Sequence, residues 1–160
     1  GLGDVYKRQV IELVKKSGYP GMKILQFAFD SREESDYLPH NYTHNCVVYT
    51  GTHDNDTVMG WYDTLKGADK KLCDDYLRLK NADGEPIPRE QIPWEFVRAA
   101  MSSVADMAII PMQDYLGLGS EARINIPSTL GTNWMWRMGN GDFTKELAGR
   151  IRSMTKLYGR

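Results

Sequence analysis

The sequence is poor in the residues that hold disulfide-linked and metal-centred folds together. Its 160 residues include only two cysteines and three histidines. Cys46 and Cys73 lack the close spacing of paired metal ligands, and two cysteines do not form a disulfide framework in a chain of this length. His40 and His44 lie in a turn-rich segment, where two histidines without a third ligand are more typical of a solvated loop. We therefore expect reduced, structural cysteines and no bound metal.

The chain also lacks an excess of charge and any long apolar run. Twenty Lys and Arg residues balance twenty-one Asp and Glu residues, which gives a net charge of −1 at pH 7. Proteins that bind nucleic acid or an anionic membrane surface usually carry a basic patch, and this composition indicates none. No stretch has the length of a membrane span, and the first residues are too charged for a secretory signal. We expect a globular, cytoplasmic protein without nucleic acid or membrane partners.

Hydrophobic spacing predicts that strands and helices alternate along the chain. Strands are predicted at residues 23–29, 46–50 and 123–126. Helices are predicted at residues 10–16, at residues 68–80, after Pro93 with an apolar stripe of Trp94, Val97, Met101 and Val104, and near the end of the chain with a stripe of Phe143, Leu147, Ile151 and Met154. Strands separated by helices favour a parallel sheet built of βαβ units.

A dense polar cluster follows the second predicted strand. It consists of Gly51-Thr52-His53-Asp54-Asn55-Asp56-Thr57, with Gly60-Trp61 shortly after. In barrels of alternating strands and helices, catalytic side chains collect where strands end at their carboxyl side. The residues alone also allow a solvated loop, because Asp, Asn and Thr are common turn formers. A calcium loop is disfavoured, since Val58 stands where a third oxygen ligand belongs.

Two further segments lie in order around this cluster. One precedes it, Pro20-Gly21-Met22-Lys23-Ile24-Leu25-Gln26-Phe27-Ala28-Phe29. The other follows it, Ala122-Arg123-Ile124-Asn125-Ile126-Pro127-Ser128-Thr129-Leu130-Gly131-Thr132-Asn133-Trp134, with Trp136-Arg137. Together the three segments resemble the amylomaltases, which are 4-alpha-glucanotransferases, also called disproportionating enzymes, and form glycoside hydrolase family 77. The resemblance extends from about residue 10 to the end of the chain.

The resemblance implies an α/β fold of incomplete extent. Amylomaltases are much longer chains, so these residues correspond to the carboxyl-terminal part of a (β/α)8 TIM barrel, about its last three strands. Eight strands are needed to close such a barrel. We therefore expect the missing amino-terminal part of the same protein to be a structural partner. Alone, the fragment would expose apolar strand edges, which predicts poor solubility or a molten state.

Residues 1–9 do not follow the family pattern. Lys7, Arg8 and Gln9 stand where the start of a helix with Thr, Pro and an acidic residue is expected. We interpret residues 1–9 as a foreign or artefactual leader, which is excluded from the fold argument, and residues 10–160 as the barrel portion. A divergent natural start is the alternative.

The resemblance also implies a reaction. Amylomaltases transfer alpha-1,4-glucan segments between maltooligosaccharides by a retaining double displacement, in which one carboxylate attacks and a second acts as acid and base. By resemblance, both belong to the fourth and fifth strands, which this chain lacks, so the fragment alone is expected to be inactive. Maltooligosaccharides and alpha-1,4-glucans are the implied partners. No cofactor is implied, because the carboxylates carry the chemistry. A non-catalytic glucan-binding remnant or an inert gene fragment is the alternative.

The same resemblance assigns roles to individual residues. Asp54 corresponds to the family's third carboxylate, which holds the hydroxyls next to the reacting carbon, and His53 corresponds to a neighbouring sugar-binding histidine. These two are the predicted catalytic residues. Asn125, Asn55 and Trp61 are the predicted substrate-binding residues.

Several of these candidates have plainer alternatives. Asn125 can instead satisfy a turn. Trp61, like Trp134 and Trp136, can instead fill the core, because tryptophan buries a large apolar area. Asp30 also follows a predicted strand and could pair with Asp54 across a cleft, but the charged run that it opens is more simply a solvated loop.

Overall fold

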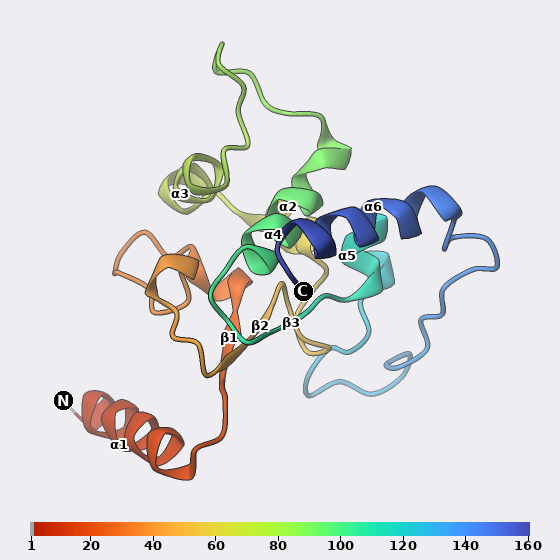
Figure 1. Ribbon diagram of the computed structural model, residues 1–160. Coiled ribbons are helices and arrows are strands. Elements are labelled where there is room, and N and C mark those ends of the chain that lie inside the picture. The colour runs from red at the N-terminus through yellow and green to blue at the C-terminus, as the bar shows by residue number, and fades with distance from the viewer. Residues whose placement is uncertain (1) are drawn as a thin grey trace.

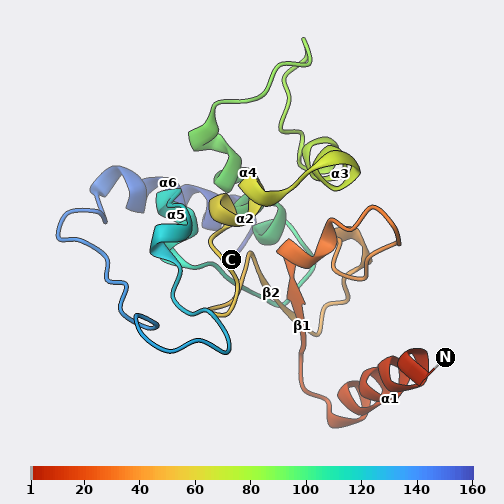
Figure 2. The ribbon, with the colours of Figure 1, turned by 180° about the vertical axis from the view of Figure 1, so that it is seen from behind.

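The structure of the chain, a computed structural model, describes residues 2–160, with side-chain packing described from Gln9 onward. A parallel sheet of three strands lies at its centre, in the order β1 (Gly21–Ile24), β2 (Cys46–Tyr49) and β3 (Met107–Ile109). Figure 1 shows most of the helices gathered to one side of these strands, with the first helix standing apart, and the reverse view in Figure 2 agrees. The fold is α/β, as the alternation of elements predicts.

Residues 2–160 contain six α-helices and four short 3-10 turns. The helices are α1 (Leu2–Ser17), α2 (Val58–Thr64), α3 (Gly67–Leu77), α4 (Ile92–Met101), α5 (Met112–Leu116) and α6 (Lys145–Leu157). The 3-10 turns are η1 (Leu25–Ala28), η2 (Pro39–Asn41), η3 (Arg89–Gln91) and η4 (Ser120–Ala122). Helix α1 runs through Gln9 and Val10 without a break, and the assignment of residues 1–9 to a foreign leader stays a prediction. None of the helices in this described part combines the length and apolar composition that crossing a membrane requires.

The predicted first strand is too long at its carboxyl end and starts too late. Strand β1 begins at Gly21 and ends at Ile24, after which the chain turns into η1. The backbone N–H of Gln26 donates to the carbonyl of Thr50, and Leu25, Ala28 and Phe29 are buried in the core. The second half of this apolar run is therefore apolar because it is buried in the core, although it does not form a strand.

The prediction of a last strand at residues 123–126 is wrong. The third strand is β3, and residues 123–126 form an irregular segment. Part of its backbone bonds to nearby side chains instead of pairing in a ladder: Arg123 Nε donates to the Asn125 carbonyl at 2.8 Å, and the Ile126 N–H donates to the Asn133 side chain at 3.0 Å. Strand β3 is three residues long, so its sequence carries little periodic signal.

An aromatic cluster forms the core between α2, α4 and η1. The Phe96 side chain is fully buried, and the rings of Phe29, Trp61 and Tyr62 meet it edge to face at centroid distances of 5.8 to 6.3 Å. Such pairs each add about 0.5–1.5 kcal/mol beyond the burial of their area. The cluster fixes α2, and with it the end of the loop that enters this helix from β2.

Two apolar stripes of the predicted helices are shorter than expected. Helix α4 ends at Met101, so Val104 lies outside it and is exposed. Phe143 is exposed as well, because it precedes Thr144, whose side chain caps α6 by accepting from the Leu147 N–H. Both residues continue the helical spacing, but each lies beyond a helix terminus.

One face of the sheet is partly uncovered. In the parallel register, Met22 pairs with Val47 and Val47 with Met107, so the three side chains point to the same face. Met22 and Met107 are 57% and 54% exposed, whereas Val48, on the opposite face, is fully buried. A cleft of about 820 Å³ lies between α1 and β1, with apolar walls that include Val10 and Phe27. Exposed apolar surface of this extent is typical of a site that a ligand or another protein surface covers.

Candidate functional site

The polar cluster lies in a loop, residues 51–57, that joins the carboxyl end of β2 to α2. Thr57 caps the helix, since its side chain accepts from the Gly60 N–H. At the other end, a Cβ on Gly51 would lie 2.5 Å from Nε2 of the buried Gln26, so a side chain there would displace the Gln26 amide. Gln26 Nε2 donates to the Asp56 carbonyl at 2.9 Å. The loop is thus held against the end of β1, at the sheet edge where the sequence predicts the site.

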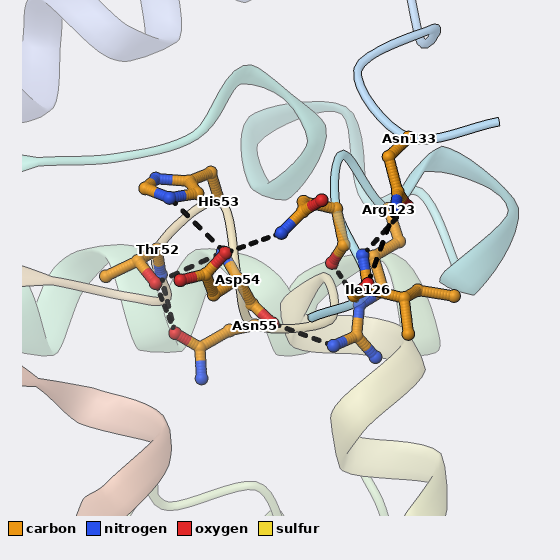
Figure 3. Close-up of polar contacts among 8 residues, drawn as sticks. Thr52, His53, Asp54, Asn55, Arg123, Ile126 and Asn133 are labelled. Carbon is orange, nitrogen blue, oxygen red and sulfur yellow. Dashed lines mark hydrogen bonds and ion pairs between the residues drawn. The ribbon is translucent and has the colours of Figure 1, made fainter. Parts of the chain in front are cut away.

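Asp54 is the centre of the contacts in this loop. Its Oδ1 accepts a hydrogen bond of 2.7 Å from Asn125 Nδ2 and lies 3.3 Å from His53 Nε2. Arg123 Nη2 donates to the Asp54 carbonyl at 2.7 Å. The side chains of His53 and Asp54 are each 52% exposed, so solvent or a ligand reaches them. Figure 3 shows Arg123 approaching the loop from the later segment. The structure therefore brings together Asp54, His53 and Asn125.

Trp134 extends the site on the side of His53. The two rings lie with centroids 5.0 Å apart and planes tilted by 39°. Trp134 is 55% exposed, and its φ of 66° is rare for a bulky residue. Two hydrogen bonds hold this conformation, because its N–H donates to the Ile124 carbonyl at 2.7 Å and its carbonyl accepts from Arg137 at 2.9 Å. An aromatic face is thereby fixed beside the histidine.

Asn55 has a local partner in the structure. Its Oδ1 accepts from the N–H and the hydroxyl of Thr52, at 2.9 and 2.7 Å. The Asn55 N–H also donates to the Thr52 carbonyl at 3.1 Å, so these contacts close a turn from Thr52 to Asn55, as expected for a loop rich in turn-forming residues. Asp56 has a distant partner, since its Oδ2 accepts from the Ser120 hydroxyl at 2.6 Å. These side chains shape the loop around Asp54.

Trp61 and Asp30 do not join the cluster. Trp61 packs its ring against Phe29 and Phe96, which agrees with the alternative interpretation of this tryptophan as a core residue. Asp30 pairs with Arg32 at 2.6 Å on the surface. The hydrogen bond from Arg32 lowers the pKa of Asp30 to about 2. Its place in an exposed charged turn matches the solvated-loop interpretation.

Asp114 is a residue of the site that the sequence does not reveal. This side chain of α5 is only 1% exposed, yet it carries a carboxyl group. Its Oδ2 accepts from the Thr50 hydroxyl at 2.5 Å, and its Oδ1 accepts from the Val58 N–H at 2.8 Å. Burial raises the pKa of Asp114 and the charge of Asp56 adds to the rise, while the two hydrogen bonds lower it, so that the net pKa is about 6. The available signal in the sequence was that Asp114 is an acidic residue in the mostly apolar segment 107–116.

The chemistry of the exposed groups favours recognition of hydroxyls. A carboxylate accepts hydrogen bonds, an imidazole and an amide both accept and donate, and an aromatic face covers the apolar side of a ring. Within the described residues no group of three histidine, cysteine or acidic side chains is placed to hold a metal ion. The site therefore suits a neutral, hydroxyl-rich ligand.

Comparison with known proteins identifies the family of the sequence. Residues 2–142 match the family described as 4-alpha-glucanotransferase. The 4-alpha-glucanotransferase of Clostridium butyricum is 48% identical over 153 residues, which cover 95% of this chain and 30% of the relative. The chloroplastic/amyloplastic 4-alpha-glucanotransferase of Solanum tuberosum is 46% identical over 159 residues, covering 98% of this chain and 26% of the relative.

A solved structure shares the fold. The amylomaltase from Streptococcus agalactiae in complex with acarbose superposes with a TM-score of 0.85 at 35% sequence identity, over 95% of this chain and 30% of that one. The chain thus spans less than a third of the length of these relatives.

Proposed function

The chain belongs to the 4-alpha-glucanotransferase family, and on this premise we propose that it supplies one part of an enzyme that transfers alpha-1,4-glucan segments between maltooligosaccharides. The observation that carries the proposal is the half-exposed Asp54 carboxylate, held by Asn125 and flanked by His53 at the carboxyl end of β2. This group of side chains suits the hydroxyls of a glucan.

The proposed reaction proceeds by two displacements with retention. A carboxylate attacks the anomeric carbon while the bond to the glycosidic oxygen breaks, and an acid donates its proton to that oxygen. The 4-hydroxyl of an acceptor glucan then attacks the same carbon, its proton returns to the acid/base, and the carboxylate is released. We assign the attacking carboxylate and the acid/base to the part of the protein outside this chain.

In this reaction Asp54 would bind the sugar hydroxyls next to the reacting carbon. Such hydrogen bonds strengthen as positive charge develops on the ring, and they can contribute several kcal/mol to the transition state. His53 would bind a neighbouring hydroxyl. Asn125 would hold the Asp54 carboxylate in place while the amide remains at the edge of the site. The location of Trp61 in the core supports assigning it a structural role.

The remainder of the same protein is the proposed structural partner. The exposed row of Met22 and Met107 and the cleft beside α1 support an incomplete barrel, because these apolar surfaces would be covered when further strands close the sheet. The site would then lie at the mouth of the completed barrel, where loops from several strands meet.

A hybrid enzyme tests this proposal. In it, the 153 matching residues of the Clostridium butyricum enzyme are replaced by those of this chain. We expect the hybrid to convert maltotriose into glucose and longer maltooligosaccharides. Asp54→Asn should lower kcat/KM by about 100-fold or more, the size typical of a lost transition-state contact. Asp30→Asn, a carboxylate in a solvated turn, is the matched control and should leave the rate unchanged.

The outcomes separate the alternatives. A folded hybrid in which Asp54→Asn is as active as its parent would contradict the role of Asp54. A folded hybrid without transfer that still binds acarbose, with His53→Ala weakening that binding, would instead indicate a glucan-binding remnant.

A further inference from the structure

The two ends of the loop that carries His53 and Asp54 meet on one buried side chain. Thr50 is the last residue before the loop and Val58 is the first residue of α2 after it. Both donate to the carboxyl group of Asp114, which belongs to neither element. Asp114 therefore bridges the loop across its base from a position in α5.

The neighbour of Asp114 contacts the other half of the site. Gln113 is buried, and its Nε2 donates to the Ala122 carbonyl at 3.2 Å, directly before the segment that contains Arg123 and Asn125. Two consecutive side chains of α5 thus hold the two segments that meet at Asp54. Helix α5 is short, but it connects both sides of the site.

A buried carboxyl group is costly unless its oxygens accept hydrogen bonds. Packing alone could fill this position with leucine, which is close in size and carries no polar group to satisfy. The two oxygens of Asp114 instead match two donors at the ends of one loop. Among the described residues the titratable group facing it is Asp56, from the same loop. The position is better explained by control of loop geometry than by filling of space.

We propose that Asp114 is a positioning residue, which fixes both ends of loop 51–57 and thereby holds Asp54 and His53 in the arrangement that binds glucan. The inference rests on the proposed function for the role of Asp54. The fixing of the loop by itself does not, and it can be measured separately.

The chemistry of the side chain defines a conservative variant. In Asp114→Asn, the amide oxygen can accept from the Val58 N–H, and the amide N–H can donate to the Thr50 hydroxyl, which rotates to accept. The loop ends remain bridged, as they would with a protonated carboxyl group. Asp114→Leu keeps the size but removes both acceptors, and Thr50→Val removes one donor.

A second buried carboxylate provides a matched control. Asp74 lies in α3 and is 8% exposed. It accepts from the Tyr62 hydroxyl at 2.7 Å, and this partner lies outside loop 51–57. The contact of the Tyr62 ring with Phe96, which helps to fix α2, does not involve Asp74. Asp74→Leu should therefore destabilise the protein without moving the site.

The test combines steady-state kinetics with hydrogen exchange in the hybrid enzyme. We expect Asp114→Leu to lower kcat about 100-fold and to speed amide exchange in residues 51–58 at least tenfold, with exchange in α3 unchanged. Asp114→Asn should stay within threefold of the parent in both measurements. Asp74→Leu should lower the melting temperature while kcat, KM and exchange in the loop are retained.

The outcomes are separable. Unchanged loop exchange in a folded Asp114→Leu protein would overturn the inference, whatever the activity. If Asp114→Leu does not fold, Thr50→Val decides, because unchanged exchange of the loop in that variant overturns the inference and faster exchange supports it. If Asp54→Asn leaves the activity of the hybrid unchanged, the proposed function is refuted. The exchange data would still decide whether Asp114 fixes the loop.

Discussion

Asn125 donates a hydrogen bond of 2.7 Å to the carboxylate of Asp54, although 71 positions separate the two residues in the sequence. The contact occupies Oδ1 of Asp54, which also faces His53. A carboxylate held from two sides loses little freedom when it binds a hydroxyl, so in the proposed function this pair would orient Asp54 before a ligand binds.

The Asn125 contact predicts an ordered series of variants. In the hybrid enzyme, Asn125→Ala should lower kcat/KM for maltotriose about tenfold, the effect of losing one hydrogen bond to a charged group. Asn125→Asp should lower it further, because a second carboxylate would face Asp54 at hydrogen-bond distance. Initial rates of glucose release measure both. If the aspartate variant is as active as the parent, Asn125 does not hold Asp54 during the reaction.

The aromatic face of Trp134 predicts a contribution to ligand affinity. Its ring is half exposed and fixed beside His53. Trp134→Ala should weaken acarbose binding to the hybrid about tenfold, which corresponds to about 1.4 kcal/mol. Trp134→Phe keeps a face for stacking and should remain within about threefold, measured by titration calorimetry. Equal affinities of the alanine variant and the parent would remove Trp134 from the binding site.

Substitution of Trp61 should affect stability and not ligand affinity, the opposite of the result expected for Trp134. Since its ring packs on Phe29 and Phe96, Trp61→Leu should lower the free energy of unfolding by about 2–4 kcal/mol and leave acarbose affinity within twofold. Urea unfolding and calorimetry of the hybrid measure the two quantities. A loss of affinity without a loss of stability would restore Trp61 to the substrate-binding residues.

Asp114 predicts how stability depends on pH. Its pKa is raised to about 6 by burial, above the ordinary value of 3.8 that it regains on unfolding. The folded state therefore binds more protons than the unfolded state between these values, and its stability falls as the pH rises from about 4 to about 6. The loss is on the order of 2–3 kcal/mol. Asp114→Asn should remove this part of the dependence, and melting curves of both proteins across the range test it. Parallel curves would contradict the assigned titration.

The uncovered sheet face predicts the behaviour of the isolated chain. Met22, Met107 and Ile109 expose apolar side chains on the strands. The 160-residue chain alone should bind a hydrophobic dye and self-associate, and Met107→Thr with Ile109→Thr should reduce both. Light scattering and dye fluorescence report these properties. A monomer with a sharp, cooperative melt and no dye binding would show that the sheet needs no further cover.

The sequence was informative where one local pattern decides the structure. Residues 46–50 followed by the Gly51 turn predict a strand with a polar loop at its end, and β2 confirms the strand. The role of Asp54 and His53 in that loop stays a prediction. The family prediction is confirmed as well. Strand β3 was missed, because three residues give no usable periodicity. Asp114 was missed because its role depends on two donors at distant positions, Thr50 and Val58, which only the folded chain brings together.

The contacts that hold the Asp54 loop also set the time at which the site can form during synthesis. Except for Gln26, the side chains that hold the loop from outside, Asp114, Ser120, Arg123 and Asn125, all follow it along the chain by more than fifty positions. A ribosome that has just released β2 and α2 has therefore made the motif but not the site. A nascent chain arrested before residue 114 would display His53 and Asp54 on a loop that Gln26 alone holds from outside, and the contacts around Asp54 could form only after residues 114–125 have left the exit tunnel.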